Sequence, residues 1–162
     1  MKSFTDNLGR AWTLVVNVAT IKRVRALCGV DLNSIIEVEE GKPSAKLLER
    51  LSTDPVLLVD VLYAVCKNEC DSKNVSDEDF GSAMAGDAIE HASAALLDEI
   101  IDFFPEAKRQ AFRKILSASR RFEQAARKRL ETMLADSGFE EKLASEVERL
   151  TGLSPSAPES AE

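Results

Sequence analysis

The sequence predicts a mainly α-helical fold, in which an N-terminal β-hairpin is followed by a multi-helix bundle with one long C-terminal helix. Three observations support this prediction. Apolar residues recur at helical spacing over most of the chain, and aromatic residues make up only 6% of it. In addition, positions 1–17 are rich in β-branched and aromatic residues. The length of 162 residues is typical of one domain, or of one domain with an appendage.

Residues 1–17 are expected to form the hairpin. Two short runs, at 3–5 and 11–16, flank a turn cluster in which Gly9 supplies a positive φ. The strand period of two then places Phe4, Trp12 and Leu14 on one side. Because two strands alone are marginally stable in water, this hairpin must dock on the helices or pair with another chain through its free edge.

Residues 18–104 are expected to form the helical core. Asn17 is a residue type that caps the start of a helix, and Gly29 is one that ends it, so a first helix is expected between them. Leu32, with two isoleucines after it, suggests a short second helix before the breaker at 39–43, and another is expected to open at Ser44.

The strongest start signal is Asp54 followed by Pro55, a cap and a proline at the first helical position. The helix that they open, to about residue 70, is apolar nearly all round and is expected at the centre of the core. Further along, residues 76–79 resemble a capping box before a short helix. A longer helix is expected from about Asp87 to Phe104.

Residues 105–150 are expected to form a long basic amphipathic helix and a short terminal helix, followed by a disordered tail at 151–162. The apolar stripe of the long helix is spaced by threes and fours. Its large members are Phe112, Ile115, Phe122, Leu130 and Met133. This stripe either offers a surface to a partner helix or packs within the chain, and the sequence leaves both open.

Charge is segregated along the chain. Residues 61–105 hold two basic and ten acidic side chains, whereas residues 106–130 hold nine basic and two acidic ones. The basic face includes a helical line formed by Arg109, Arg113, Arg120 and Arg127. It either binds phosphate or acidic groups, or pairs with the acidic helix before it. The net charge of −7 argues against nucleic acid as the main partner.

No catalytic, cofactor or metal site is expected, and the chain is not predicted to be an enzyme. Cys28, Cys66 and Cys70 are an odd number, which argues against a disulfide framework. Cys66 and Cys70 share a helix face and form half a metal site or, more simply, part of the core. The single histidine, His91, lies on another predicted helix and is expected to be at the surface or half-buried. Residues 81–86 have phosphate-loop glycine spacing, but Asp87 stands where that loop needs lysine.

The chain is also expected to be cytoplasmic and not to span a membrane. It has no window of about 18 apolar residues. The first residues lack the apolar core of a secretory signal.

Several blocks of the sequence resemble the tail assembly chaperones of long-tailed bacteriophages and prophages. They span residues 4–14, 21–32, 54–63, 75–80, 86–89 and 103–105. The resemblance covers roughly residues 1–105 and consists of hairpin, helix and cap patterns. The long basic helix and the tail lie outside it.

The resemblance implies a non-enzymatic role in building a phage tail. Proteins of this family bind the long tape-measure protein, keep it soluble and help tail-tube subunits assemble around it, without remaining in the finished particle. It also implies a homo-oligomer in the cytoplasm of a bacterial host. Two alternatives stay open: another phage structural or connector protein, and a regulatory adaptor that contacts nucleic acid through the basic helix.

Overall fold

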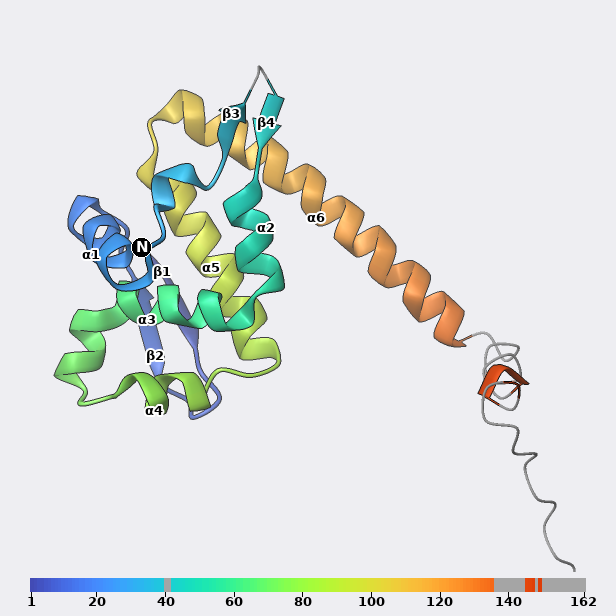
Figure 1. The fold of residues 1–162 in the computed structure, drawn as a ribbon, viewed down its shortest axis with the longest axis horizontal. Helices are drawn as coiled ribbons and strands as arrows, with labels where there is room; N and C mark the ends of the chain where they lie inside the picture. The colour runs from blue at the N-terminus through green and yellow to red at the C-terminus, as the bar shows by residue number, and fades with distance from the viewer. Residues whose placement is uncertain (40–41, 136–144, 148, 150–162) are drawn as a thin grey trace, which may run out of the picture. The chain divides into compact units, whose positions relative to one another are not determined.

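The computed structural model describes residues 1–39, 42–135, 145–147 and 149, which are coloured in Figure 1. At residues 38, 39, 42, 43, 119, 120, 122 and 123 the description covers the backbone alone. The chain divides into two compact units, unit 1 (Met1–Arg113) and unit 2 (Lys114–Glu162). The fold is mainly α-helical and opens with a two-stranded hairpin, which confirms these two parts of the prediction from sequence.

The N-terminal hairpin pairs strand β1 (Lys2–Thr5) with strand β2 (Ala11–Leu14) in antiparallel register, with Phe4 opposite Trp12. Phe4, Trp12 and Leu14 are all buried, as the strand period predicts for residues of one face. The hairpin is therefore docked on the helices, which supplies the apolar contact that two strands lack by themselves.

The loop of this hairpin is tied to a distant part of unit 1. Gly9 has a φ of +76°, the left-handed conformation expected from its place in the turn. The backbone N–H of Asn7 donates to the carbonyl of Ala83 at 3.1 Å, and its side-chain amide donates to the carbonyl of Ala85 at 3.1 Å. These bonds fix the loop against a segment more than 70 residues away in the sequence.

Helix α1 (Val18–Cys28) has the predicted caps. The Asn17 side chain accepts a hydrogen bond from the N–H of Thr20 at 3.0 Å. Gly29 closes the helix with a φ of +65°. Both ends satisfy backbone groups that a helix otherwise leaves without partners.

The segment after α1 differs from the prediction in part. Leu32 begins a single 3₁₀ turn, η1 (Leu32–Ser34), and not a longer helix. A second, unpredicted hairpin then pairs β3 (Glu37–Glu39) with β4 (Lys42–Ser44). Its sequence signal is weak because each strand has three residues, too few to establish a period of two. Helix α2 (Lys46–Thr53) follows, so the helix predicted to open at Ser44 begins two residues later.

Helix α3 (Pro55–Ser72) lies at the centre of unit 1, as its apolar composition predicts. The Asp54 side chain accepts a hydrogen bond from the N–H of Leu57 at 3.0 Å, and Pro55 occupies the first turn. The helix contacts α1, α2 and β2. It buries most of its apolar side chains, although Val56 at its start is 70% exposed.

Helices α4 (Asp77–Ser82) and α5 (Asp87–Phe103) complete the surroundings of α3, and both contact it. The predicted capping box is present, since Ser76 and Asp79 each accept a hydrogen bond from the other's backbone N–H. Helix α5 also packs against β1, and its buried alanines at 88 and 92 allow a close approach.

The core of unit 1 contains a cluster of aromatic rings around Phe80, which is fully buried. The Phe80 ring lies 5.0 Å from that of Trp12, 5.7 Å from Tyr63 and 6.5 Å from Phe4, measured between centroids. The cluster joins β1, β2, α3 and α4, so the hairpin is part of the main core. Edge-on contacts of this kind add to the stabilisation from burial itself.

Helix α6 (Glu106–Ala135) begins in unit 1 and ends in unit 2. The carbonyl of Pro105 accepts the first helical hydrogen bond, from the N–H of Arg109 at 2.9 Å. Its 30 residues include neither glycine nor proline and are rich in alanine, arginine, lysine and leucine. These are the strongest helix formers, which explains the length of the helix.

Candidate functional site

The candidate site is the exposed apolar surface at the C-terminal end of α6. Leu130 and Met133 are each 57% exposed, and Leu134 is 58% exposed. Single apolar side chains at a surface are common, but three within five residues of one helix form a patch. We call these three residues the α6 patch.

The beginning of the same helical stripe has a different environment. Phe112, in unit 1, is buried, and its ring packs edge-on against Phe104 at 5.0 Å. Ile115 is half-buried. The Phe122 side chain lies outside the described residues. The two interpretations left open by the sequence therefore apply to different parts of the stripe: Phe112 packs internally, and Leu130 and Met133 do not.

The basic face is divided in a similar way. Within unit 1, Arg113 donates to Asp102 of α5 at 2.6 Å, so the acidic helix supplies the expected counter-charge there. Arg109 Nη2 lies 3.4 Å from Oε2 of Glu106 on the same helix, so these two side chains form an ion pair. The Arg120 side chain lies outside the described residues, and Arg127 is exposed.

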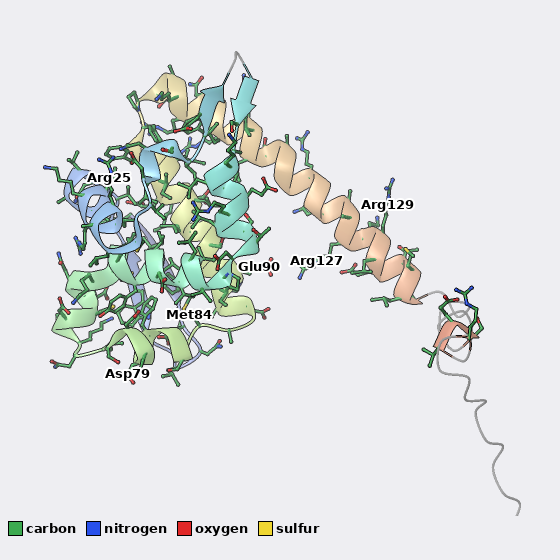
Figure 2. All side chains as sticks on the ribbon, in the orientation of Figure 1. Arg25, Asp79, Met84, Glu90, Arg127 and Arg129 are labelled. Carbon is green, nitrogen blue, oxygen red and sulfur yellow. The ribbon has the colours of Figure 1, made fainter. Side chains whose placement is uncertain are left out.

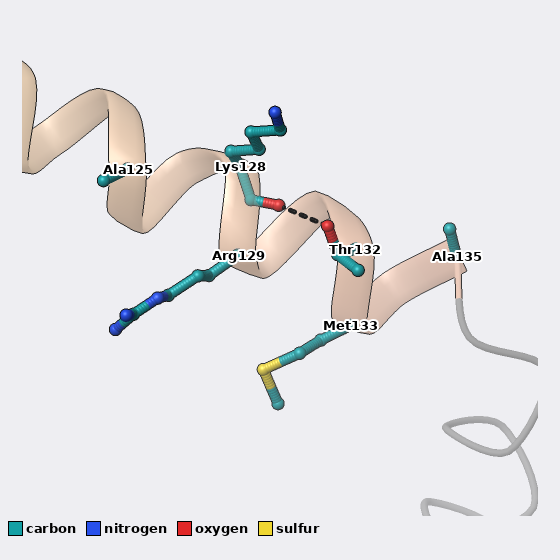
Figure 3. A pocket seen from close by; sticks show the side chains of 6 residues that line it. All are labelled: Ala125, Lys128, Arg129, Thr132, Met133 and Ala135. Carbon is teal, nitrogen blue, oxygen red and sulfur yellow. Dashed lines mark hydrogen bonds between the residues drawn. The ribbon is translucent and has the colours of Figure 1, made fainter.

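Further cations surround the end of α6. Arg121, Lys128 and Arg129 are exposed, and none has an ion-pair partner within the part of the chain that the structure describes. An open pocket follows this stretch of the helix, and Figure 3 shows the side chains that line it. The lining residues are Ala125, Lys128, Arg129, Thr132, Met133 and Ala135. Met133 and Arg129 thus bring apolar and cationic surface to the same place.

The hairpin residues predicted to bind a partner lie elsewhere. Phe4 is 5% exposed, and Trp12 and Leu14 are 0% exposed. All three belong to the core of unit 1, where they fill space between helices. Partner binding through them would require the hairpin to undock, so we place the candidate site on the α6 patch alone.

A buried carboxylate that sequence reasoning missed organises the hairpin. Asp6 Oδ2 accepts hydrogen bonds from Arg10 Nε at 2.7 Å and from Trp12 Nε1 at 2.9 Å. Its Oδ1 accepts from the backbone N–H groups of Leu8 and Arg10 at 3.0 and 2.9 Å. The signal was present, because an aspartate that opens a turn with glycine three residues later is typical of such side-chain bonds.

The charge of Asp6 is retained in the fold. Burial acts to raise the pKa of this carboxyl, but the hydrogen bonds from Trp12 and Arg10 and the nearby guanidinium outweigh it, so the pKa is lowered. All the donors come from the hairpin itself. Asp6 is thus a structural residue, and its four bonds leave no acceptor for a substrate.

The three cysteines are buried or half-buried. Cys66 and Cys70 are buried, and burial raises the pKa of their thiols to about 12 and about 11. Cys28 is half-buried, and its pKa is also raised, first by burial and then by Asp60 and Asp77. Across residues 1–39 and 42–135, no group of three or more potential ligands is placed to hold a metal ion. His91 is exposed on α5.

Comparison with known proteins finds no matching protein family, curated protein or solved structure. Within the described residues, none of the helices combines the length and apolar character needed to cross a bilayer.

Proposed function

We propose that this chain is a non-enzymatic tail assembly chaperone of a long-tailed bacteriophage or prophage. In this role it acts in the host cytoplasm, binds the tape-measure protein, keeps it soluble and helps tail-tube subunits assemble around it. The proposal starts from the resemblance, which covers roughly residues 1–105. The observation that supports it best is the α6 patch, which presents apolar surface on a long helix.

The physical argument concerns what a chaperone of a long helical protein must offer. Unassembled amphipathic helices expose apolar faces and aggregate, so their chaperone needs accessible apolar surface at helical spacing. Leu130, Met133 and Leu134 have this spacing and are more than half exposed. Unit 1 has its own core and gives the helix a folded base.

The test is co-expression with a tape-measure fragment and the tail-tube protein from the same gene cluster, followed by pull-down and size exclusion. We expect the chain to keep the fragment soluble in a defined complex. It should also be absent from purified particles, because a connector or other structural protein would remain there. A fragment that stays insoluble in the presence of the chain would contradict the proposal.

A matched pair of variants locates the surface. Leu130→Asp places a charge in the α6 patch, and Leu27→Asp places the same charge at a leucine of α1 with nearly equal exposure, 59% against 57%. Both sites are exposed, so both variants should fold. We expect Leu130→Asp to lose the tape-measure fragment and Leu27→Asp to retain it. If both variants retain the tape-measure fragment equally, the α6 patch is not the surface that binds it.

A further inference from the structure

A row of cations follows one side of α6. Lys114, Arg121 and Lys128 recur every seven residues, about two helical turns apart, so the three positions lie nearly in line. At the rise of an α-helix the row is about 21 Å long. All three side chains are exposed. Figure 2 shows Arg127 and Arg129, the sequence neighbours of Lys128, standing out from the same stretch of helix. We call Lys114, Arg121 and Lys128 the cationic row.

The part of the chain that the structure describes does not neutralise this row. None of its three side chains has an ion-pair partner there. Residues 107–122 hold six basic side chains and no acidic one. Position 123 is acidic, but it is two residues from Arg121 and therefore about 200° away round the helix. Glu131, three residues after Lys128, marks the end of the row.

The cationic row lies on a different side of α6 from the α6 patch. Lys128 precedes Leu130 by two residues, which again separates them by about 200°. In Figure 3, Lys128 projects away from Arg129 and Met133. The other exposed residues on the side of the row are small or uncharged: Ser117, Ala118, Gln124 and Ala125. The row therefore presents charge without any large apolar side chain.

We propose that the cationic row binds the phosphate backbone of duplex nucleic acid without reading its sequence. The proposal goes beyond the chaperone role, because it uses the side of α6 that the α6 patch leaves unused. Contacts from lysine and arginine to phosphates are electrostatic and need no apolar surface. They position a protein on the duplex, whereas sequence is read at the base edges. The row also has no aromatic side chain on which an unpaired base could stack.

The composition of the row favours nucleic acid over a protein or a membrane. A partner helix packs through an apolar seam, and the centre of a protein interface is depleted of charged residues. An acidic helix or a second copy held by the apolar side of α6 would leave the row in solvent. A helix at a membrane surface likewise inserts its apolar face and keeps the opposite side in water. A duplex carries one charge per about 1.7 Å of its axis, so it can neutralise the whole row.

The net charge of −7 does not oppose this contact directly, because charge is segregated along the chain. Residues 61–105 hold ten acidic side chains, whereas residues 106–130 hold nine basic and two acidic ones. Salt screens exposed charges that are more than about 10 Å apart at 0.1 M. A polyanion on the row therefore responds mainly to the charges close to its contact. The distant acidic residues keep the binding weak and make it depend on salt.

The test measures binding of the full chain to a short fluorescein-labelled DNA duplex by fluorescence anisotropy. Three phosphate contacts predict a slope of about −2.7 when the logarithm of the association constant is plotted against that of the salt concentration. A fourfold rise in salt should then weaken binding about 40-fold. A second duplex of unrelated sequence should bind equally well. Absence of binding at low salt, or an affinity that salt does not change, would overturn the inference.

A matched pair of arginine variants tests the position of the contact. Arg121→Gln removes the central cation of the row and should reduce the slope to about −1.8. Arg129→Gln is the control, since Arg129 is also an exposed arginine of α6 but projects to the side of Met133. It should leave the slope near −2.7. Equal changes in the two variants would show that binding follows net charge and not the row, and would overturn the inference.

Competition separates the other occupants. An acidic helical peptide that displaces the duplex and binds more tightly would replace nucleic acid with a protein partner. Vesicles of phosphatidylserine and phosphatidylcholine that displace it and bind more tightly would replace nucleic acid with a membrane surface. Leu130→Ala changes only the α6 patch and should leave the affinity for the duplex unchanged. A loss of duplex binding in this variant would show that the contact is not confined to the row, and would overturn the inference.

Discussion

The indole N–H of Trp12 donates a hydrogen bond to Oδ2 of Asp6 at 2.9 Å, so the largest fully buried side chain of unit 1 is joined to a buried carboxylate. This bond makes the turn of the hairpin and the aromatic core of unit 1 depend on each other. The Trp12 ring packs 5.0 Å from that of Phe80, and the Asp6 carboxylate also accepts a hydrogen bond from the backbone N–H of Arg10 in the turn.

Replacing Asp6 with asparagine is expected to lower the free energy of unfolding by about 2–3 kcal/mol at neutral pH. Asparagine has one acceptor oxygen, so its NH2 group would face either the donors Trp12 Nε1 and Arg10 Nε or the backbone N–H groups of Leu8 and Arg10. Urea unfolding followed by tryptophan fluorescence measures the change. Asp71→Asn, which affects only the exposed ion pair with Lys67, is the control and should change the free energy little.

The contribution of Asp6 should also depend on pH. Its pKa in the folded chain lies below its unfolded value of 3.8, so the stabilisation is complete above about pH 3.8 and is lost as pH falls through the folded pKa. The difference in unfolding free energy between the wild-type chain and Asp6→Asn should therefore narrow as pH falls below 3.8. A constant difference across this range would show that the carboxylate charge contributes nothing.

Ser76→Ala is expected to lower the free energy of unfolding by about 1 kcal/mol, because it removes the N-cap of α4. The Ser76 hydroxyl accepts from the N–H of Asp79 at 3.1 Å, and this bond cannot form with alanine. Thermal unfolding would detect the loss. Ser72→Ala, at the end of α3 and exposed, is the matched control and should stay within about 0.5 kcal/mol of the wild type.

Alkylation should distinguish the three cysteines. Cys28 is half-buried and should react slowly with iodoacetamide in the native chain, whereas Cys66 and Cys70 should react only after unfolding. Burial protects these two thiols, and the raised pKa values of about 12 and about 11 keep them protonated at neutral pH. Mass spectrometry with and without denaturant gives the pattern, and Cys28→Ser should leave the native chain unlabelled. Native labelling of Cys66 would contradict the structure.

The two halves of the stripe of α6 should differ in their effect on stability. Phe112→Ala removes a buried ring that packs against Phe104 and should lower the free energy of unfolding by about 3 kcal/mol or more. Leu130→Ala removes a side chain that is 57% exposed and should change it by less than about 1 kcal/mol. Thermal unfolding of both variants provides the comparison. A large loss for Leu130→Ala would mean that the chain itself covers this residue.

Local signals in the sequence were sufficient for much of the fold. Asn17, Asp54 and Ser76 cap helices where their residue types predict, because capping depends on a few neighbouring atoms. The period of two placed Phe4 and Trp12 on one face of the hairpin, and the structure shows that this face is buried. The strands β3 and β4 were missed, since three residues carry too little pattern to separate a strand from a turn.

The candidate site was only partly predictable, for a different reason. Helical spacing put Phe112 and Leu130 in one stripe, but spacing does not tell which residues meet another element of the same chain. Phe112 is buried because Phe104 lies beside it, and this contact depends on how α5 ends and α6 begins. The Asp6 cluster needed the same kind of information, since Trp12 reaches Asp6 only after the strands pair.

The outer edge of β2 is already occupied. The N–H of Thr13 donates to Oε2 of Glu69 at 2.9 Å, and Nζ of Lys73 donates to the carbonyl of Ala11 at 2.6 Å. Both side chains belong to the last turns of α3 and its C-cap.

These side chains take two of the backbone groups through which a further strand would attach, so this edge of β2 is protected against pairing with a strand of another molecule. At high protein concentration, that protection limits edge-to-edge aggregation through this hairpin strand.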